Sequence, residues 1–216
     1  MFKLDYLLTR MPYLSRPEPD PKPMDCRILT AALKLFVNQG YHNVSVHDVQ
    51  KQADVSIGSI YKHFGGKEGM AKALHERLLV EMNEMVDSVI AQDLTIIEQC
   101  NRIIELLFEY TETRCEIIAF ILHANHTEFI SDEPPICSAE PFQKIRDMVQ
   151  RGMDTGEIQA YDCLIAASVI FGGAFRLIHM RLDGLIDRPL PELYEQLIDA
   201  TWRGMKIQVE PGVSNK

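Results

Sequence analysis

The chain has 216 residues, of which 46% are hydrophobic and 25% charged, and this composition is typical of a soluble globular protein with a substantial core. Its five cysteines form no CxxC pair and are odd in number, which argues against a disulfide framework and a zinc knuckle and favours a reducing, cytoplasmic compartment. The formal net charge of −9 argues against a protein that binds a polyanion over its whole surface.

The charge is divided unevenly along the chain. Residues 1–80 contain eleven Lys and Arg against eight Asp and Glu, a balance of +3, whereas residues 81–216 contain eleven against twenty-three, a balance of −12. Local potential decides where a polyanion can dock. The amino-terminal part is therefore the only candidate for a nucleic-acid-binding surface, and the acidic remainder is expected to face away.

Residues 1–23 are expected to form an amino-terminal extension that belongs to no core, because five prolines in this segment keep the chain extended. Arg10, Arg16 and Lys22 could make it a basic arm that enters a minor groove. The alternative, which we favour, is an upstream extension without a role in binding, because Met24 would itself be a sensible first residue.

A first helix is predicted from Asp25 to Gln39. Its apolar residues recur at spacings of three and four, and Gly40 lies just past its end. Leu33 and Phe36 are expected to cover the inner faces of the two short helices that follow, so their role is structural.

A short helix is predicted to follow Ser45, whose hydroxyl can cap it. Val46, Val49 and Ala53 recur at spacings of three and four and form one apolar stripe. A helix this short buries too little surface to persist alone, so we expect it to pack inside a larger unit.

A turn over residues 54–56 separates this helix from a second short one. Asp54 is among the few side chains that tolerate a left-handed backbone, and Ser56 is placed to cap the next helix. Ile60 and Phe64 share one face of that helix and can hold it against the core. The pair of glycines that follows is expected to end it.

The outward positions of the second short helix carry side chains that suit close approach to a DNA duplex. They are small, hydroxylated, aromatic or basic, namely Gly58, Ser59, Tyr61, Lys62 and His63. Small residues admit the phosphate backbone, and hydroxyl and basic groups bond to phosphate oxygens and base edges. Lys67 opens the next helix, where amide donors and a lysine could hold one phosphate together.

The run from Val55 to Phe64, followed by Lys67 and Glu68, resembles the helix-turn-helix signature of the TetR family of bacterial transcriptional regulators. The preceding pattern of Ala31, Leu35, Phe36, Gly40 and Tyr41 extends the resemblance to about residues 24–72. Two positions depart from the usual pattern. Gln50 stands where a small residue is common, and Asp54 stands where glycine is common.

The resemblance implies an all-α fold in which an amino-terminal three-helix head is joined to a helical ligand-binding and dimerisation body. The head would be a helix-turn-helix DNA-binding domain over residues 24–70, and the body would occupy residues 71–216. The residues expected to contact DNA are Ser45, Val46, Ser56, Ile57, Gly58, Ser59, Tyr61, Lys62, His63 and Lys67.

The chain beyond the head is expected to be helical throughout. A long helix is predicted from Lys67 to about Gln92, and the resemblance implies that it carries a displacement from the body to the head. Apolar stripes predict further helices near residues 96–110, 117–124 and 142–152, with a break between the last two. An alternating strand pattern is absent from the sequence.

Two carboxy-terminal helices are expected to form a dimer interface. Residues 163–175 carry no charge but are too few to span a membrane, so a buried helix is predicted there, and a last helix is predicted over residues 190–207. The resemblance implies that the two helices pair with their copies in a second subunit as a four-helix bundle. The alternative is that they close the core of a monomer. We favour the homodimer because a two-fold protein places two heads on successive major grooves and so reads a palindrome.

A small-molecule site is expected between helices of the body, apolar with a few polar anchors. The candidate lining residues are Phe108, Phe120, His123, His126, Met148, Phe175, Arg176 and His179. Each is weighed against a role in the core, where most helical aromatic residues lie. His123 and His126 are three residues apart, but no carboxylate motif lies at a fitting distance, so neither a metal nor a cofactor is predicted.

The sequence thus predicts a DNA-binding transcriptional regulator, a repressor that a small-molecule effector releases from a palindromic operator by thermodynamic linkage. The alternative is a helical ligand-binding or scaffold protein without specific DNA binding, which Gln50, Asp54 and the acidic total would favour. An enzyme is not expected, because the sequence contains no nucleophile-base-acid spacing, phosphate loop or metal motif.

Overall fold

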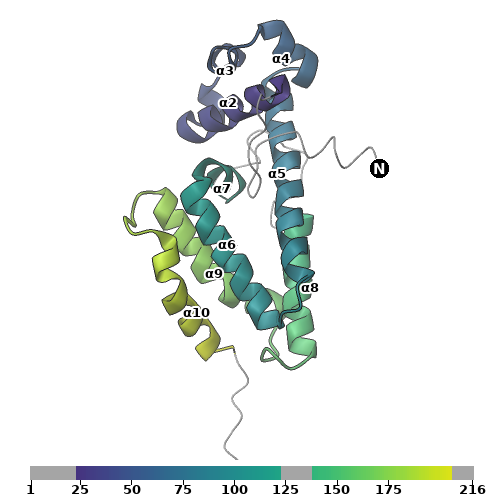
Figure 1. Ribbon diagram of the computed structural model, residues 1–216, viewed down its shortest axis with the longest axis vertical. Helices are drawn as coiled ribbons and strands as arrows, with labels where there is room; N and C mark the ends of the chain where they lie inside the picture. The colour runs from purple at the N-terminus through teal and green to yellow at the C-terminus, as the bar shows by residue number, and fades with distance from the viewer. Residues whose placement is uncertain (1–22, 123–137, 206–216) are drawn as a thin grey trace, which may run out of the picture. The chain divides into compact units, whose positions relative to one another are not determined.

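The computed structural model describes residues 23–122 and 138–205, and every regular element within these ranges is helical (Figure 1). The prediction of an all-α fold is confirmed. Contacts divide the chain into two compact units, one comprising Met1–Ser88 and Tyr110–Phe142 and the other comprising Val89–Glu109 and Gln143–Lys216.

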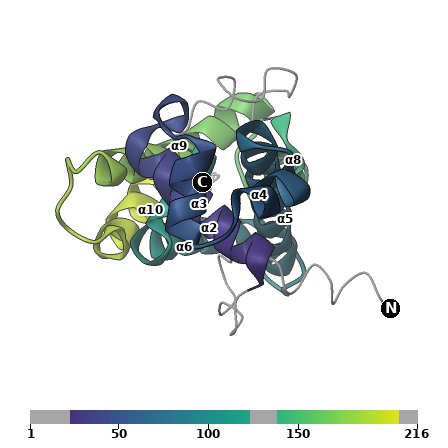
Figure 2. The same ribbon diagram turned by 90° about the horizontal axis from the view of Figure 1, so that it is seen from above.

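The first unit begins with the three helices of the head. Helix α2 spans Met24–Gln39, α3 spans Val46–Ala53 and α4 spans Ile57–Phe64, and a short 3-10 turn, η1, covers Tyr41–Asn43 between α2 and α3. The predicted starts of the three helices agree with these bounds within one residue. Figure 2 shows α3 and α4 joined by the tight turn that the sequence predicts.

Helix α2 supplies much of the core of the head. Ile28, Leu29 and Ala32 are fully buried, and Phe36 is buried as predicted. The helix packs against α3 on one side and also against α7, which spans Cys115–Leu122 and belongs to the same unit. A segment more than seventy residues further along the chain is therefore in contact with the first helix of the head.

Helix α5, Lys67–Ile90, continues from the head. Leu74, Leu78 and Met82 lie on one side of this helix at spacings of four residues, and all three are buried. An ion pair joins α5 to the first turn of α2, with Arg77 Nη2 placed 3.6 Å from Asp25 Oδ2. Because Asp25 is buried, this pair contributes to the register between the two helices.

The second unit contains most of α6, Ile96–Thr113, and most of α8, Glu140–Asp154, together with α9, Cys163–Leu182, and α10, Tyr194–Arg203. The Ile96 amide at the start of α6 donates to Glu157 Oε2 at 2.8 Å. Helix α10 is tied to α6 by Trp202, whose indole nitrogen donates to Asn101 Oδ1 at 2.6 Å. Both bonds join segments that lie far apart in the sequence.

Helix α9 is only partly a buried helix, which corrects one expectation. It extends beyond the uncharged segment to Leu182, and Ala166, Ile170 and Ala174 on one side are fully buried. The other side is exposed, with Leu164 at 65%, Ile165 at 57% and Val169 at 48%. By length and composition alone α9 could cross a membrane, a test that core helices of soluble proteins also pass.

The last helix also differs from its prediction over residues 190–207. The segment begins with a 3-10 turn at Leu190–Leu193, named η4, and the α-helix α10 starts only at Tyr194. Pro191 lies at the beginning of this turn, where its missing amide leaves no intrahelical bond unmade. Residues beyond 205 lie outside the described part of the chain.

Candidate nucleic-acid interface

Helix α3 begins with a capping box built from Ser45 and Asp48. The Ser45 hydroxyl oxygen accepts from the Asp48 amide at 3.2 Å, and the Asp48 carboxylate accepts from the Ser45 amide at 2.8 Å. Hydrogen bonds from the Ser45 side chain and backbone lower the pKa of Asp48 below its ordinary value. The predicted cap is therefore confirmed, and the exposed Ser45 and half-buried Val46 lie at the first turn of α3.

The turn between α3 and α4 adopts the predicted left-handed conformation. Asp54 has φ 52° and ψ 56°, and it is the sole non-glycine residue with positive φ in the described ranges. Ser56 then caps α4, since its hydroxyl oxygen accepts from the Ser59 amide at 3.1 Å and lies 2.8 Å from the Ser59 hydroxyl. Both short helices thus begin at a serine that bonds to the third residue of its helix.

Helix α4 has one buried side and one exposed side. Ile60 is completely buried and holds the helix to the core, while Phe64 on the same face is half-buried. Tyr61 is 55% exposed, Gly58, Lys62 and His63 are exposed, and Ile57 and Ser59 are half-buried. An eight-residue helix that presents small, aromatic and basic groups outward has the chemistry to contact both phosphates and base edges in a groove.

Lys67 at the start of α5 is held by a residue that the sequence reasoning did not include in the site. Its Nζ donates to the Tyr41 carbonyl oxygen at 3.0 Å and lies 4.3 Å from the centre of the Tyr41 ring. Burial, and to a smaller extent the charge of Glu68, raises the pKa of Tyr41. Gly40 and Tyr41 belong to the pattern that carries the family resemblance, so that pattern was the signal that could have placed Tyr41 in the site.

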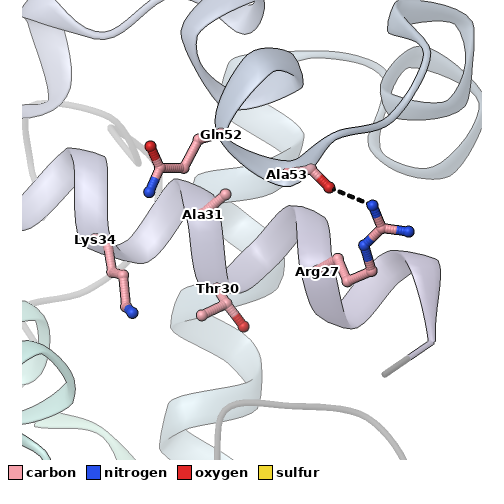
Figure 3. Close-up of a pocket in the computed structure, with 6 residues that line it drawn as sticks. All are labelled: Arg27, Thr30, Ala31, Lys34, Gln52 and Ala53. Atoms are coloured by element: carbon pink, nitrogen blue, oxygen red, sulfur yellow. Dashed lines mark hydrogen bonds between the residues drawn. The ribbon is translucent and has the colours of Figure 1, made fainter. Parts of the chain in front are cut away.

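A pocket of about 200 Å³ opens between α2 and α3, as Figure 3 shows. It is lined by Arg27, Thr30, Ala31, Lys34, Gln52 and Ala53. Arg27 reaches from α2 to the carbonyl of Ala53 at the end of α3, which places a basic group beside the turn that precedes α4. Neither Arg27 nor this pocket was singled out by the sequence.

The predicted ligand-binding residues are distributed over both units. Phe108, Met148, Phe175, Arg176 and His179 belong to the second unit, whereas Phe120 belongs to the first. Phe108, Phe120 and Met148 are buried, and Arg176 is exposed on α9. His179 Nδ1 donates to the Phe175 carbonyl oxygen at 2.7 Å. His123 and His126 lie outside the described residues, and no group of three metal-ligating side chains occurs among residues 23–122 and 138–205.

Comparisons with known proteins agree with the geometry of the head. Residues 28–74 match the family model described as bacterial regulatory proteins, tetR family. The chain is 24% identical over 182 residues to the HTH-type transcriptional regulator YvkB of Bacillus subtilis, a match that covers 81% of this chain and 93% of YvkB. It is 27% identical over 150 residues to the HTH-type transcriptional regulator UidR of Escherichia coli K12, covering 62% of this chain and 70% of UidR.

Solved structures share the fold. A TetR family transcription regulator from Marinobacter aquaeolei superposes with a TM-score of 0.70 at 19% identity, covering 84% of this chain and 95% of that chain. FadR from Bacillus subtilis, solved in complex with stearoyl-CoA, superposes with a TM-score of 0.61 at 21% identity, covering 81% of this chain and 96% of that chain. The chain thus carries a DNA-binding domain of the tetR family over residues 28–74 and is a DNA-binding transcriptional regulator.

Proposed function

We propose that the chain is a homodimeric repressor that binds a palindromic operator and leaves it when a small molecule binds the helical body. The observation that carries the proposal is the two-sided α4, in which a fully buried Ile60 holds the helix while Tyr61, Lys62 and His63 project outward. A helix anchored in this way can enter a major groove without unfolding the head. The DNA-binding domain would comprise residues 24–70, and residues 71–216 would regulate it.

The proposed DNA contacts come from the ends of three helices. The candidate residues are Ser45, Val46, Ser56, Ile57, Gly58, Ser59, Tyr61, Lys62, His63 and Lys67. Residues at the starts of α3 and α5 would bond to phosphates and fix the position of the head, because amide donors and a lysine gather there. The exposed side chains of α4 would read base edges.

The exposed apolar side of α9 supports a homodimer. Leu164, Ile165 and Val169 would otherwise leave a contiguous apolar strip in water. A second copy related by a two-fold axis would cover this strip with the same strip of its own α9. Two heads held in this way could occupy two successive major grooves, which explains why the operator should be a palindrome.

The effector is proposed to be a small, largely apolar molecule. Among the relatives is the fatty acid metabolism regulator protein of Bacillus subtilis, 25% identical over 165 residues, covering 70% of this chain and 79% of that protein. The solved FadR complex holds stearoyl-CoA. Buried aromatic and thioether groups of the second unit, such as Phe108 and Met148, have the chemistry to contact an acyl chain. We further propose a cytoplasmic protein without enzymatic activity, as expected of such a regulator.

Selection of duplexes from a random pool tests the proposed operator binding. The expected result is enrichment of a palindrome whose binding weakens steeply with salt. Tyr61→Ala should reduce affinity for the enriched duplex by about tenfold or more, because the exposed side chain contributes to binding and not to folding. Tyr161→Ala is a matched control, since Tyr161 is 44% exposed but lies outside the head. Binding that is equal for enriched and scrambled duplexes would contradict the proposal.

A thermal-shift screen tests the proposed effector class. A ligand that binds only the folded chain raises its melting temperature, so acyl-CoA thioesters of increasing chain length form the first panel, with free CoA as the control. The same compounds should release the enriched duplex, because an effector and an operator that favour different states weaken each other's binding. A thioester that stabilises the protein but leaves DNA binding unchanged would contradict its role as the inducer.

A further inference from the structure

Three successive backbone carbonyls in the turn between α3 and α4 accept hydrogen bonds from side chains. Arg27 Nη2 donates to the Ala53 carbonyl at 2.7 Å and to the Asp54 carbonyl at 2.6 Å. Gln50 Nε2 donates to the Val55 carbonyl at 3.0 Å. The first donor comes from α2 and the second from α3, so the turn is held from two helices.

Two backbone bonds of the same turn are longer than these side-chain bonds. The Asp54 amide lies 3.4 Å from the Lys51 carbonyl oxygen, and the Val55 amide lies 3.3 Å from the Gln50 carbonyl oxygen. Hydrogen bonds weaken as the distance grows beyond about 3 Å. The Asp54 amide also bonds to the Gln50 carbonyl, and the side chains of Arg27 and Gln50 add three hydrogen bonds to this backbone bonding.

Asp54 gives the turn a particular need for such support. Its left-handed backbone is unfavourable for a residue with a Cβ atom, although aspartate tolerates it better than most. The Asp54 side chain is fully exposed, and its Oδ2 lies 3.6 Å from Arg27 Nη2. The Asp54 carboxylate thus attracts the same Arg27 guanidinium group that donates to the Asp54 backbone carbonyl.

We propose that Arg27 and Gln50 are positioning residues that set the orientation of α4 and thereby the sequence preference of the head. The turn is the pivot between α3 and α4, and Ser56, which caps α4, directly follows the last of the three bonded carbonyls. Base edges are read over short distances that demand an accurately placed helix, whereas phosphate contacts carry no base information. The inference rests on the proposed sequence-selective binding by α4.

The variant Arg27→Met distinguishes a role of Arg27 in positioning α4 from a direct contact between Arg27 and DNA. Methionine keeps a long, helix-compatible side chain but cannot donate to the turn. We expect affinity for the enriched palindrome to fall by about tenfold or more, while affinity for a scrambled duplex and the salt dependence of binding stay unchanged. A phosphate contact would instead weaken both duplexes equally and reduce the salt slope by about 1, and this outcome would overturn the proposal.

Lys34→Met is the matched control for charge. Lys34 lies on the same helix and lines the same pocket, but in the described part of the chain it has no bond to the turn. Its replacement removes the same charge from α2. We expect the ratio of affinities for the palindrome and the scrambled duplex to stay at the wild-type value. A ratio that falls as much as in Arg27→Met would assign the effect to charge and contradict positioning.

Gln50→Leu and Gln52→Leu form a second matched pair on α3. The half-buried Gln50 side chain bonds to Val55, whereas the exposed Gln52 side chain makes no hydrogen bond to a residue that the structure describes. Gln50→Leu should lower the affinity ratio and Gln52→Leu should preserve it. Circular dichroism at the temperature of the binding assay confirms that each variant is folded, so an unfolded head cannot imitate the effect.

Asp54→Gly provides a rescue that an unrelated structural defect would not show. Glycine adopts the left-handed conformation without steric cost, so the turn should depend less on Arg27. Arg27→Met lowers the affinity ratio by some factor in the wild type. We expect that factor to be smaller by about twofold or more in the Asp54→Gly background. Equal losses in the two backgrounds would overturn the coupling. If the wild-type protein itself failed to discriminate the two duplexes, the proposed function would fail before this inference was tested.

Discussion

The ammonium nitrogen of Lys67 lies 3.0 Å from the carbonyl oxygen of Tyr41 and 4.3 Å from the centre of its ring. These two contacts hold the lysine where α5 begins, three residues after α4 ends at Phe64. An ammonium group has three donors, and the Tyr41 carbonyl takes one of them. The remaining donors of this ammonium group are the basis of the proposed phosphate contact at the start of α5.

Lys67→Met should weaken binding to all duplexes by a similar factor. A phosphate contact carries no base information, so the enriched palindrome and a scrambled duplex should lose affinity equally, and the salt slope should decrease by about 1. Fluorescence anisotropy over a series of salt concentrations measures both quantities. Lys72→Met removes an exposed charge from the same helix and is the control. A loss confined to the palindrome would instead assign Lys67 to base recognition.

The capping box of α3 should give the head a defined acid sensitivity. Because its folded pKa is lowered, Asp48 stabilises the head fully above its unfolded pKa of about 3.9, and this stabilisation is lost as the pH falls through the folded pKa. Ser45→Ala removes the side-chain hydrogen bond, so the pKa of Asp48 should rise towards its ordinary value. The urea midpoint should then drop at pH 7, and the drop should become smaller as the pH falls through the folded pKa of Asp48.

Carboxyl carbon NMR titration measures the pKa of Asp48 in both proteins. Glu98 provides an internal control, because hydrogen bonds from Thr95 lower its pKa in a similar capping arrangement at the start of α6. The pKa of Glu98 should be the same with and without Ser45. An Asp48 pKa that does not respond to Ser45→Ala would show that the capping box is not what lowers it.

Local signals explain why the head was predictable from the sequence. Ser45 and Ser56 cap their own helices, and Asp54 adopts the left-handed turn that its position indicated. Each of these features depends on residues within three or four positions of one another. The apolar residues that recur along α2 and α5 also predicted the core of the head, because Ile28 and Leu74 are buried, as their spacing indicates.

The remaining features depend on contacts between distant residues. Arg27 bonds to a turn 26 positions further along the chain, and no local pattern marks that bond. The lack of charge in residues 163–175 could not indicate that Ile165 and Val169 are exposed while Ala166 is buried, because composition does not distinguish a buried apolar face from an exposed one. Pro191 could have indicated that the last α-helix begins after residue 190.

Asn101→Ala should destabilise the second unit. Trp202 is 4% exposed and donates its indole N–H to Asn101 Oδ1, so alanine would leave a buried donor without an acceptor at a cost of about 1–3 kcal/mol. Trp202 is the single tryptophan of the chain, so its fluorescence during urea unfolding reports on this unit. Asn38→Ala on the exposed surface of α2 is the control and should stay within about 0.5 kcal/mol of the wild type. Equal midpoints for the two variants would contradict a structural role for the bond.

Substitutions at two adjacent glycines of α9 distinguish packing within the protomer from contact between protomers. A Cβ atom at Gly173 would lie 2.8 Å from Leu197 Cδ1 of α10, so Gly173→Ala should displace the tip of that half-buried side chain and lose part of the gain in helix propensity. A Cβ atom at Gly172 meets no atom of the described chain within 4 Å. Gly172→Leu should therefore fold normally and even gain helix propensity, yet a bulky group beside Val169 should obstruct close approach of a second copy.

Sedimentation equilibrium and operator binding measure the consequence of Gly172→Leu. We expect the dimer to weaken by about tenfold or more and operator affinity to fall with it, because a monomer places only one head on the palindrome. Thermal unfolding of Gly172→Leu at low protein concentration should match that of the wild-type monomer, which excludes misfolding as the cause. A Gly172→Leu protein that keeps the mass and operator affinity of the wild type would place the dimer contact elsewhere than this side of α9.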